Sequence, residues 1–268
     1  MVNILKVRAV CLYIALVWSG SANDTNSVWR VRSTGNFDSS FYLDDCILGV
    51  RPVVILKKSD IVVEIKPVAN GSLDDIGTIV TIGDQQFYTI GTEGDNVKLL
   101  SKYNLHVGNQ YDDDNRVVAL ASPTGKQSED AIGYFGGFSA DNPIIGVTAF
   151  SSSSQKGTNY SDYNGSIVEG YVNNYKTILE NDYDVDIVEA RLITKDELIS
   201  EEIGCSTSPS SCINAPSFIY STTYWTGSAI DDNYVWDVNG FGYFGSGSYN
   251  DDNVSGVRPV IIISKSLF

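Results

Sequence analysis

The feature that most limits how this chain can fold is an internal repeat. Residues 18–59 align with residues 225–266 without a gap, and 23 of the 42 aligned pairs are identical. Both copies close on the same Gly-Val-Arg-Pro run, at 49–52 and at 256–259. Such self-similarity indicates duplication of one structural unit. We therefore expect the same local structure in both copies.

The differences between the copies alternate along the chain. Differing positions in the first copy include 30, 32, 34, 36, 38 and 40. Because successive side chains of a strand point to opposite faces, this period of two predicts strands with one constant face against a core and one variable, exposed face. The residues expected on the constant face are Val31, Gly35 and Phe37 and their counterparts Val238, Gly242 and Phe244.

The differing positions also use a restricted set of residue types. Lys, Glu, Gln, Met and Trp are absent from those between 18 and 53 and from their counterparts, although Lys and Glu are common in ordinary surface drift. Every residue found there can be encoded by an AAY codon whose adenines have been randomised. The alternative is the drift of two old duplicates on an exposed face that tolerates change.

These residues resemble the variable proteins of diversity-generating retroelements, in which a C-terminal region with a C-type-lectin-like fold is mutated at adenines. The resemblance rests on Tyr224-Trp-Thr-Gly-Ser-Ala229, on the Asn/Asp/Tyr/Ser-rich stretch to Asn253, and on the closing strand from Gly256. Bacterial and phage-associated surface proteins end in a similar Gly-Val-Arg-Pro strand. The resemblance covers 224–268 well and 77–268 loosely.

The resemblance implies an α+β, C-type-lectin-like domain that presents varied side chains to a ligand, in a secreted, cell-surface or phage-particle protein. Retroelement machinery would act on the gene and not on the protein. The residues expected to contact the ligand are Ile230, Asp232, Tyr234, Asp237, Asn239, Phe241, Tyr243, Ser248, Asn250, Asn253 and Ser255. Tyr supplies contact area at low entropic cost, and Ser and Asn supply adaptable hydrogen bonds. A protein on a target surface is the expected partner, with a glycan as the alternative.

Two other functions compete with ligand binding. A structural subunit of a pilus or phage tail would use the repeat for assembly. An enzyme of the formylglycine-generating type would share the fold class, but it needs a cysteine pair in a cleft, whereas Cys205 and Cys212 precede the variable strands. We expect no catalytic residue, cofactor or metal ligand.

Charge and composition exclude several partners. A net charge of −15 disfavours nucleic acid and anionic lipid, whose binding needs clustered Lys and Arg. The single histidine, His106, excludes a multi-histidine metal site within one chain and is expected in a loop. Acidic runs at 112–115 and 251–252 are read as solvated loops, with calcium as the alternative.

The cysteines and the amino terminus leave open questions. Cys205 and Cys212 flank a short, turn-rich loop that a disulfide could close, although free cysteines would look the same. Residues 1–16 contain Lys6 and Arg8 and enter an apolar run too short to span a bilayer. The order of charge, apolar core and small residues is that of a secretory signal, but the run also overlaps the repeat.

The extra partial copy of the variable segment spans 17–61. It is followed by a connector at 62–76 and a domain at 77–268, whose variable region is 224–259. Three strands are expected at 77–82, 86–90 and 97–100, and the last strand, 260–263, is expected to return to the first. Arg258 is expected to form structural hydrogen bonds.

Two helices are expected in this domain. A capping box of Ser166 with Glu169 predicts one helix, whose apolar residues are Val168, Tyr171, Val172, Tyr175, Ile178 and Leu179. A second box at Thr194 and Glu197 predicts another, ending near Gly204.

Overall fold

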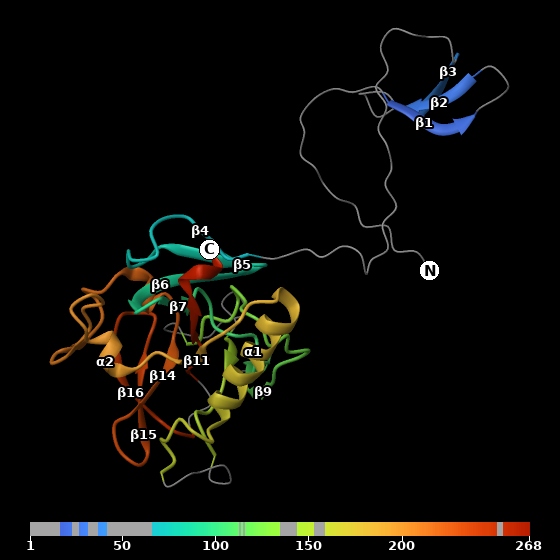
Figure 1. The fold of residues 1–268 in the computed structure, drawn as a ribbon. Coiled ribbons are helices and arrows are strands. Elements are labelled where there is room, and N and C mark those ends of the chain that lie inside the picture. The colour runs from blue at the N-terminus through green and yellow to red at the C-terminus, as the bar shows by residue number, and fades with distance from the viewer. Residues whose placement is uncertain are drawn as a thin grey trace. The chain divides into compact units, whose positions relative to one another are not determined.

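The computed structural model describes residues 17–22, 27–31, 37–41, 66–112, 114, 116–134, 144–152, 159–250 and 254–268. The chain divides into two compact units, Met1–Val62 and Val63–Phe268. Antiparallel strands dominate the described residues and helices are few, so the fold is α+β-like and mainly β (Figure 1). The predicted leader, 1–16, lies outside the described residues.

The first unit repeats a sheet of the second unit strand by strand. The strands of the two copies are β1 (Val17–Ala22), β2 (Ser27–Val31) and β3 (Phe37–Phe41), and β14 (Tyr224–Ala229), β15 (Tyr234–Val238) and β16 (Phe244–Ser248). The pairing of Val17 with Val31 corresponds to that of Tyr224 with Val238, and both sheets have a register shift between their first and second strands. The expected structural equivalence of the copies is confirmed at the level of strand pairing.

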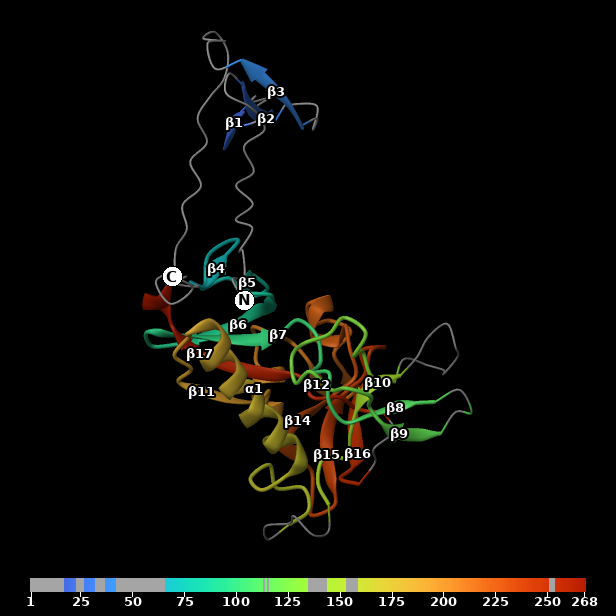
Figure 2. The ribbon, with the colours of Figure 1, turned by 90° about the vertical axis from the view of Figure 1, so that its right-hand side faces the viewer.

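The second unit contains a six-stranded antiparallel sheet (Figure 2). Its strand order is β11-β17-β7-β6-β5-β4. Its strands are β4 (Val68–Ala69), β5 (Ile79–Ile82), β6 (Gln85–Glu93), β7 (Asn96–Ser101), β11 (Glu189–Leu192) and β17 (Pro259–Ser264). The three strands expected at 77–82, 86–90 and 97–100 are present as β5, β6 and β7, and they pair antiparallel in sequence order.

The position of β17 differs from the prediction. This strand lies between β7 and β11 and does not pair with β5, the first strand of the meander. Its residues are apolar on both sides, because Val260 packs in one core cluster while Ile261 and Ile263 pack in another. A strand that is buried on both faces belongs in the middle of a sheet.

Part of the predicted connector belongs to the second unit. Val68 pairs with Thr81 across β4 and β5, and Asn70 Oδ1 accepts a hydrogen bond of 2.8 Å from the Ile79 N–H. Leu73 packs against the core. Residues 66–76 therefore form the edge of the sheet.

Helix α1 (Ile167–Tyr183) packs against this sheet. Ser166 Oγ accepts from the Glu169 N–H at 3.0 Å, but the Glu169 carboxylate accepts from the Gly165 N–H, so only half of the expected capping box is present. The buried side chains of the helix are Val168, Val172, Tyr175, Leu179 and Tyr183. They form one core cluster with β5, β7 and β17 side chains.

Helix α2 (Lys195–Leu198) is shorter than predicted. Its capping box between Thr194 and Glu197 is complete. Beyond Leu198 the Ser200 N–H donates to the Glu197 carbonyl, three residues back, which is the tighter geometry of a helix end. Residues 199–204 therefore continue as turns.

Smaller elements complete the second unit. They are β8 (Asn109–Tyr111), β9 (Val117–Ala119), β10 (Ile145–Val147), the hairpin β12 (Ser206–Thr207) and β13 (Ser210–Ser211), and the 3-10 helices η2 (Ser217–Tyr220) and η3 (Lys265–Leu267). Bridges from Gly256 to Val147 and Tyr224 join the β8–β10 sheet to β14.

Candidate ligand-binding surface

The strands β14–β16 are called the variable sheet here, because the differences between the two copies fall on this segment. Side chains on both faces of this sheet pack in core clusters. Trp225 and Val235 pack in the cluster that contains α1. Tyr224, Val238 and Phe244 pack in a second cluster with α2 and the two cysteines of the β12–β13 hairpin. Apart from Ser246 on β16, the exposed side chains of this sheet lie at its turns and strand ends. The prediction that one whole face is exposed is therefore wrong.

The residues expected on the constant face are nevertheless buried in the second copy. Val238 and Phe244 have no exposed surface, and Gly242 is also buried. Gly242 has a φ of +81°, a backbone conformation that glycine adopts without steric cost.

Strand β16 breaks the expected alternation. Ser246 is identical in both copies but exposed, whereas Gly245 and Gly247 differ and are buried. An added Cβ would lie 2.0 Å from the Tyr243 ring at Gly245 and 2.5 Å from the Trp225 ring at Gly247. Each glycine is thus covered by a neighbouring aromatic side chain.

One group of expected contact residues lies where β14 turns into β15. This β14–β15 cluster comprises Ile230, Asp232, Tyr234, Ser248 and Asn250. Ile230 and Tyr234 are 41% and 46% exposed. Asp231, which both copies share, shapes the turn by accepting hydrogen bonds from the N–H groups of Asn233 and Tyr234 at 2.8 and 3.0 Å. Its identity in the two copies is explained by this local role.

A second group lies at the turn between β15 and β16. This β15–β16 cluster comprises Asn239, Phe241 and Tyr243. Phe241 and Tyr243 are 58% and 54% exposed. Asn239 is half-buried, and its Oδ1 accepts from the N–H groups of Phe241 and Tyr243 at 3.0 and 2.9 Å. Asn239 therefore shapes the turn that presents the two rings.

The structure does not bring the two clusters together. Tyr234 and Val238 begin and end β15, so the clusters are roughly 13 Å apart at the rise of an extended strand. A protein interface of ordinary size covers about 800 Å² on each partner. A macromolecule can reach both clusters at once, whereas a small ligand would contact one.

The remaining expected contact residues are Ser255, Asp237 and Asn253. Ser255 is wrongly predicted, because it has no exposed surface. The Thr148 N–H donates a hydrogen bond of 3.0 Å to the Ser255 carbonyl, and this contact holds the segment before Gly256 inside the unit. Asp237 is half-buried on β15, with its Oδ2 3.4 Å from Ser255 Oγ. Asn253 lies outside the described residues.

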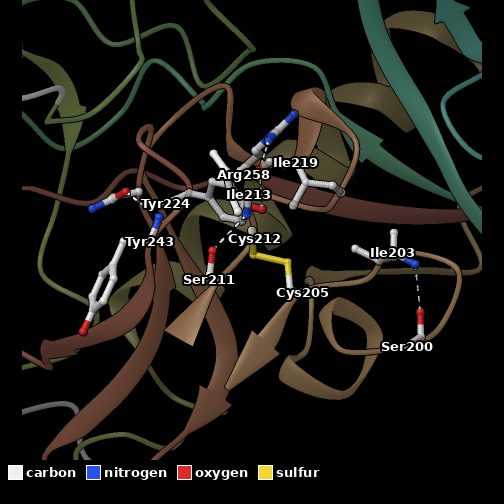
Figure 3. Close-up of a disulfide and its surroundings, with 11 residues drawn as sticks. Ser200, Ile203, Cys205, Ser211, Cys212, Ile213, Ile219, Tyr224, Tyr243 and Arg258 are labelled. Atoms are coloured by element: carbon white, nitrogen blue, oxygen red, sulfur yellow. Dashed lines mark hydrogen bonds between the residues drawn. A yellow bond between two sulfur atoms is a disulfide. The ribbon is translucent and has the colours of Figure 1, made fainter. Parts of the chain in front are cut away.

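Of the two alternatives that the sequence left open for Cys205 and Cys212, the structure has the disulfide (Figure 3). It closes the β12–β13 hairpin. The Cys212 N–H donates to the Gly242 carbonyl at 2.7 Å, which ties this hairpin to the β15–β16 turn. Ile213, which follows directly, is 59% exposed. Sequence reasoning missed Ile213 because it lies outside the repeat.

Arg258 has the structural role expected of it. The side chain is fully buried and donates to the carbonyls of Ser101, Ile219 and Lys102 at 2.7, 3.1 and 3.3 Å. Its guanidinium carbon lies 5.0 Å from the centroid of the Tyr224 ring. Burial lowers the pKa of this guanidinium.

In the first acidic run, the described residues Asp112 and Asp114 both lie beside Arg116. Arg116 pairs with Asp112 at 2.8 Å and with Asp114 at 2.9 Å. The Arg116 backbone N–H is the main cause of the lowered pKa of Asp112. Residues 251–252, the second run, lie outside the described part of the chain. Within that part, no group of three or more His, Cys, Asp or Glu side chains could hold a metal ion.

His106 lies in a loop, as expected. Its Nδ1 accepts from the Thr124 N–H at 3.1 Å.

A cleft of about 490 Å³ between the six-stranded sheet and α2 is lined by charged side chains that serve the fold. Glu197 pairs with Arg191 at 2.7 Å and with Lys98 at 3.2 Å, and Asp74 pairs with Lys265. Burial alone would raise the pKa of Glu197, but hydrogen bonds from Arg191 and the Thr194 N–H lower it to about 2. Three of the charged side chains that line the cleft, Lys98, Glu197 and Asp74, are therefore engaged in ion pairs.

No family model, curated protein or solved structure matches this chain. No helix among the residues placed by the structure has the length and apolar character needed to cross a membrane.

Proposed function

We propose that this protein is a non-catalytic, ligand-binding protein of the receptor or adhesin type, whose second unit is a C-type-lectin-like scaffold for diversified side chains. One observation carries the proposal. The large apolar side chains that are exposed on the β14–β16 segment all stand where the first copy has a polar residue. These exposed residues are Ile230, Tyr234, Phe241 and Tyr243, which align in the sequence with Asn23, Ser27, Thr34 and Asn36 of the first copy.

This pattern fits a binding surface because exposed apolar side chains contribute little to folding and gain burial from a partner. Aromatic side chains are enriched at protein interfaces for this reason. The residues beneath them, such as Trp225, Val235 and Val238, are buried and unchanged between the copies. A protein on a target surface is the proposed partner, because it can reach both clusters.

The arrangement of the second unit supports the lectin-like part of the proposal. Two helices accompany a sheet in which the C-terminal strand β17 lies between β11 and β7, and the variable strands β14–β16 form a separate sheet. The exposed differing residues Ile230, Tyr234, Phe241 and Tyr243 therefore stand on a framework whose main core side chains lie elsewhere.

Sequencing of this gene across a population of its source organism tests the proposal. We expect variation at codons for Ile230, Tyr234, Phe241 and Tyr243, with the codon for Trp225 invariant. Uniform codons at the four exposed positions would contradict diversification and favour a static duplicate.

Assembly is the second candidate function, because β1–β3 repeat the pairing of β14–β16 in the same register. Light scattering on the full chain tests it: concentration-dependent oligomers would favour assembly, and monomers would favour ligand binding. The enzyme alternative is not proposed, because Cys205 and Cys212 are bonded to each other in a loop.

A further inference from the structure

We infer that the loop before α1, residues 159–163, holds the β14–β15 turn in one conformation, so that the β14–β15 cluster is ordered before a ligand arrives. Ser161 and Tyr160 are the positioning residues of this loop. The inference rests on the proposed function and deepens it, because it gives residues from outside the repeat a role in ligand binding.

The β14–β15 turn is first closed by hydrogen bonds among its own residues. The Ile230 N–H donates to the Tyr234 carbonyl at 2.8 Å. Asp231 Oδ1 accepts from the N–H groups of Asn233 and Tyr234. These bonds do not use the backbone carbonyls of Asp231 and Asn233.

Residues from two other segments bind these carbonyls. Ser161 Oγ donates to the Asp231 carbonyl, and the Tyr249 N–H donates to the Asn233 carbonyl at 3.0 Å. Ser161 is only 2% exposed, so its hydroxyl lies inside the unit. Both bonds end on the backbone of the turn, and Asp231, Asn233 and Tyr249 are identical in the two copies. The bonds are therefore compatible with any side chain at the differing positions of the turn.

The loop that carries Ser161 is itself attached to the rest of the unit (Figure 2). The Tyr160 ring stacks on the Tyr249 ring, with a centroid distance of 4.5 Å and an interplanar angle of 12°. The N–H of Ser166, the N-cap of α1, donates to the Tyr163 carbonyl at 3.1 Å. Because α1 packs in the main core cluster, the loop connects the β14–β15 turn to that core.

A turn that is ordered in the free protein loses less conformational entropy when a ligand binds, and this raises affinity. Ile230 and Tyr234 stand on the ordered turn, whereas Phe241 and Tyr243 stand on the other turn. The gain in affinity from Ser161 should therefore pass through the first pair of side chains and not through the second.

Amide hydrogen exchange on the full chain tests the ordering without a ligand. Ser161→Ala removes the hydroxyl that donates to the turn. We expect exchange at Asn233 and Tyr234 to become about tenfold faster, with no change at Phe241 and Tyr243. Equal acceleration at both turns would overturn the inference, because it would indicate a general loosening of the unit.

Two further variants complete this experiment. Tyr160→Leu removes the stacked ring and should accelerate exchange at the same turn as Ser161→Ala. Thr78→Val is the matched control, because Thr78 is also buried and its hydroxyl donates to the Ser72 carbonyl at 2.7 Å, beside the six-stranded sheet. It should leave exchange at both turns unchanged. Unchanged exchange in both loop variants would contradict a positioning role for the loop.

Binding is then measured with a displayed library of the full chain, in which residues 230, 232, 234, 241 and 243 are randomised and binders are selected on lysozyme. In these binders Ser161→Ala should raise the Kd about fivefold. Combined with alanine at 234, the Kd should rise by less than the product of the two separate fold-changes. Combined with alanine at 241, it should rise by that product.

The two possible failures are distinguishable. If the fold-changes multiply equally at 234 and 241, the effect of Ser161 does not pass through the turn and the inference is wrong. Recovery of no binder would count against the proposed function, while hydrogen exchange would still decide whether the loop orders the turn.

Discussion

Arg258 keeps a cation in the interior of the second unit, where three backbone carbonyls and the Tyr224 ring surround it. Desolvation makes this arrangement costly, and the cost is offset only while all three hydrogen bonds are present. The side chain connects β7, η2 and β17, which are remote in the sequence. Its contribution is therefore to the packing of the unit.

Arg258→Met should lower the free energy of unfolding by about 3 kcal/mol, because it leaves the carbonyls of Ser101, Ile219 and Lys102 without their donor. Urea denaturation measures this change. Arg116→Met, which removes an exposed ion pair, should cost much less, because solvent screens the attraction between the two charges. Equal losses in the two variants would contradict the structural role of Arg258.

Tyr243→Asn, which installs the residue of the first copy, should change the free energy of unfolding by no more than about 0.5 kcal/mol, because the ring is mostly exposed. Val238→Ser should cost about 3 kcal/mol, because it puts a hydroxyl in a fully buried apolar site. Thermal melts of the two variants provide the comparison. A large loss for Tyr243→Asn would mean that the exposed ring supports the fold.

At the scale of elements, Glu197 links the start of α2 to β11 and β7. Its carboxylate completes the capping box and pairs with Arg191 and Lys98. The pKa of this group is about 2 in the folded chain, against 4.5 for the unperturbed side chain. Because the folded pKa is the lower one, the stabilisation is complete above about pH 5 and is lost as the pH falls towards 2.

Glu197→Gln should therefore lower the free energy of unfolding by about 2 kcal/mol at pH 7. This loss lies between those typical of breaking an exposed ion pair and a buried one. The difference from the parent chain should shrink as the pH falls from 5 to 2. Thermal melts over this range measure it, with Glu129→Gln at an exposed site as the control. A difference that is constant with pH would contradict the assigned ion pair.

Strand β16 passes beneath Trp225 at Gly247, so this position tests how closely the variable sheet is packed. Gly247→Ser installs the residue of the first copy and puts a Cβ about 2.5 Å from the indole ring. We expect a loss of about 2 kcal/mol from overpacking. Ser246→Ala, at the exposed neighbouring position, should be nearly neutral in the same chemical denaturation experiment. A neutral Gly247→Ser would show that the ring can move aside.

At the scale of the whole molecule, Val63–Phe268 forms a compact unit with its own sheets, helices and core clusters. A fragment of residues 63–268 should fold cooperatively by itself. Circular dichroism should show β-rich secondary structure and one sharp thermal transition. A broad transition with loss of near-ultraviolet signal would contradict independent folding.

The sequence by itself determined the features that depend on local pattern. The duplication predicted that β1–β3 and β14–β16 share one structure, the Ser166 and Thr194 caps located the starts of both helices, and the loop between Cys205 and Cys212 was short enough to close. Each of these follows from residues that lie close together in the chain. The alignment of the two copies likewise located the positions at which the β14–β16 segment differs from β1–β3.

Only the tertiary structure decided which of the differing residues are exposed. Alternation predicted one open face, but segments remote in sequence cover both faces of β14–β16. Exposure is therefore concentrated at the turns, with Ser246 as an exposed position on β16, and Ser255 is buried. The same long-range packing places β17 between β7 and β11 and brings Ile213 to Gly242. Exposure is a property of contacts between distant segments, and a local pattern of period two does not contain those contacts.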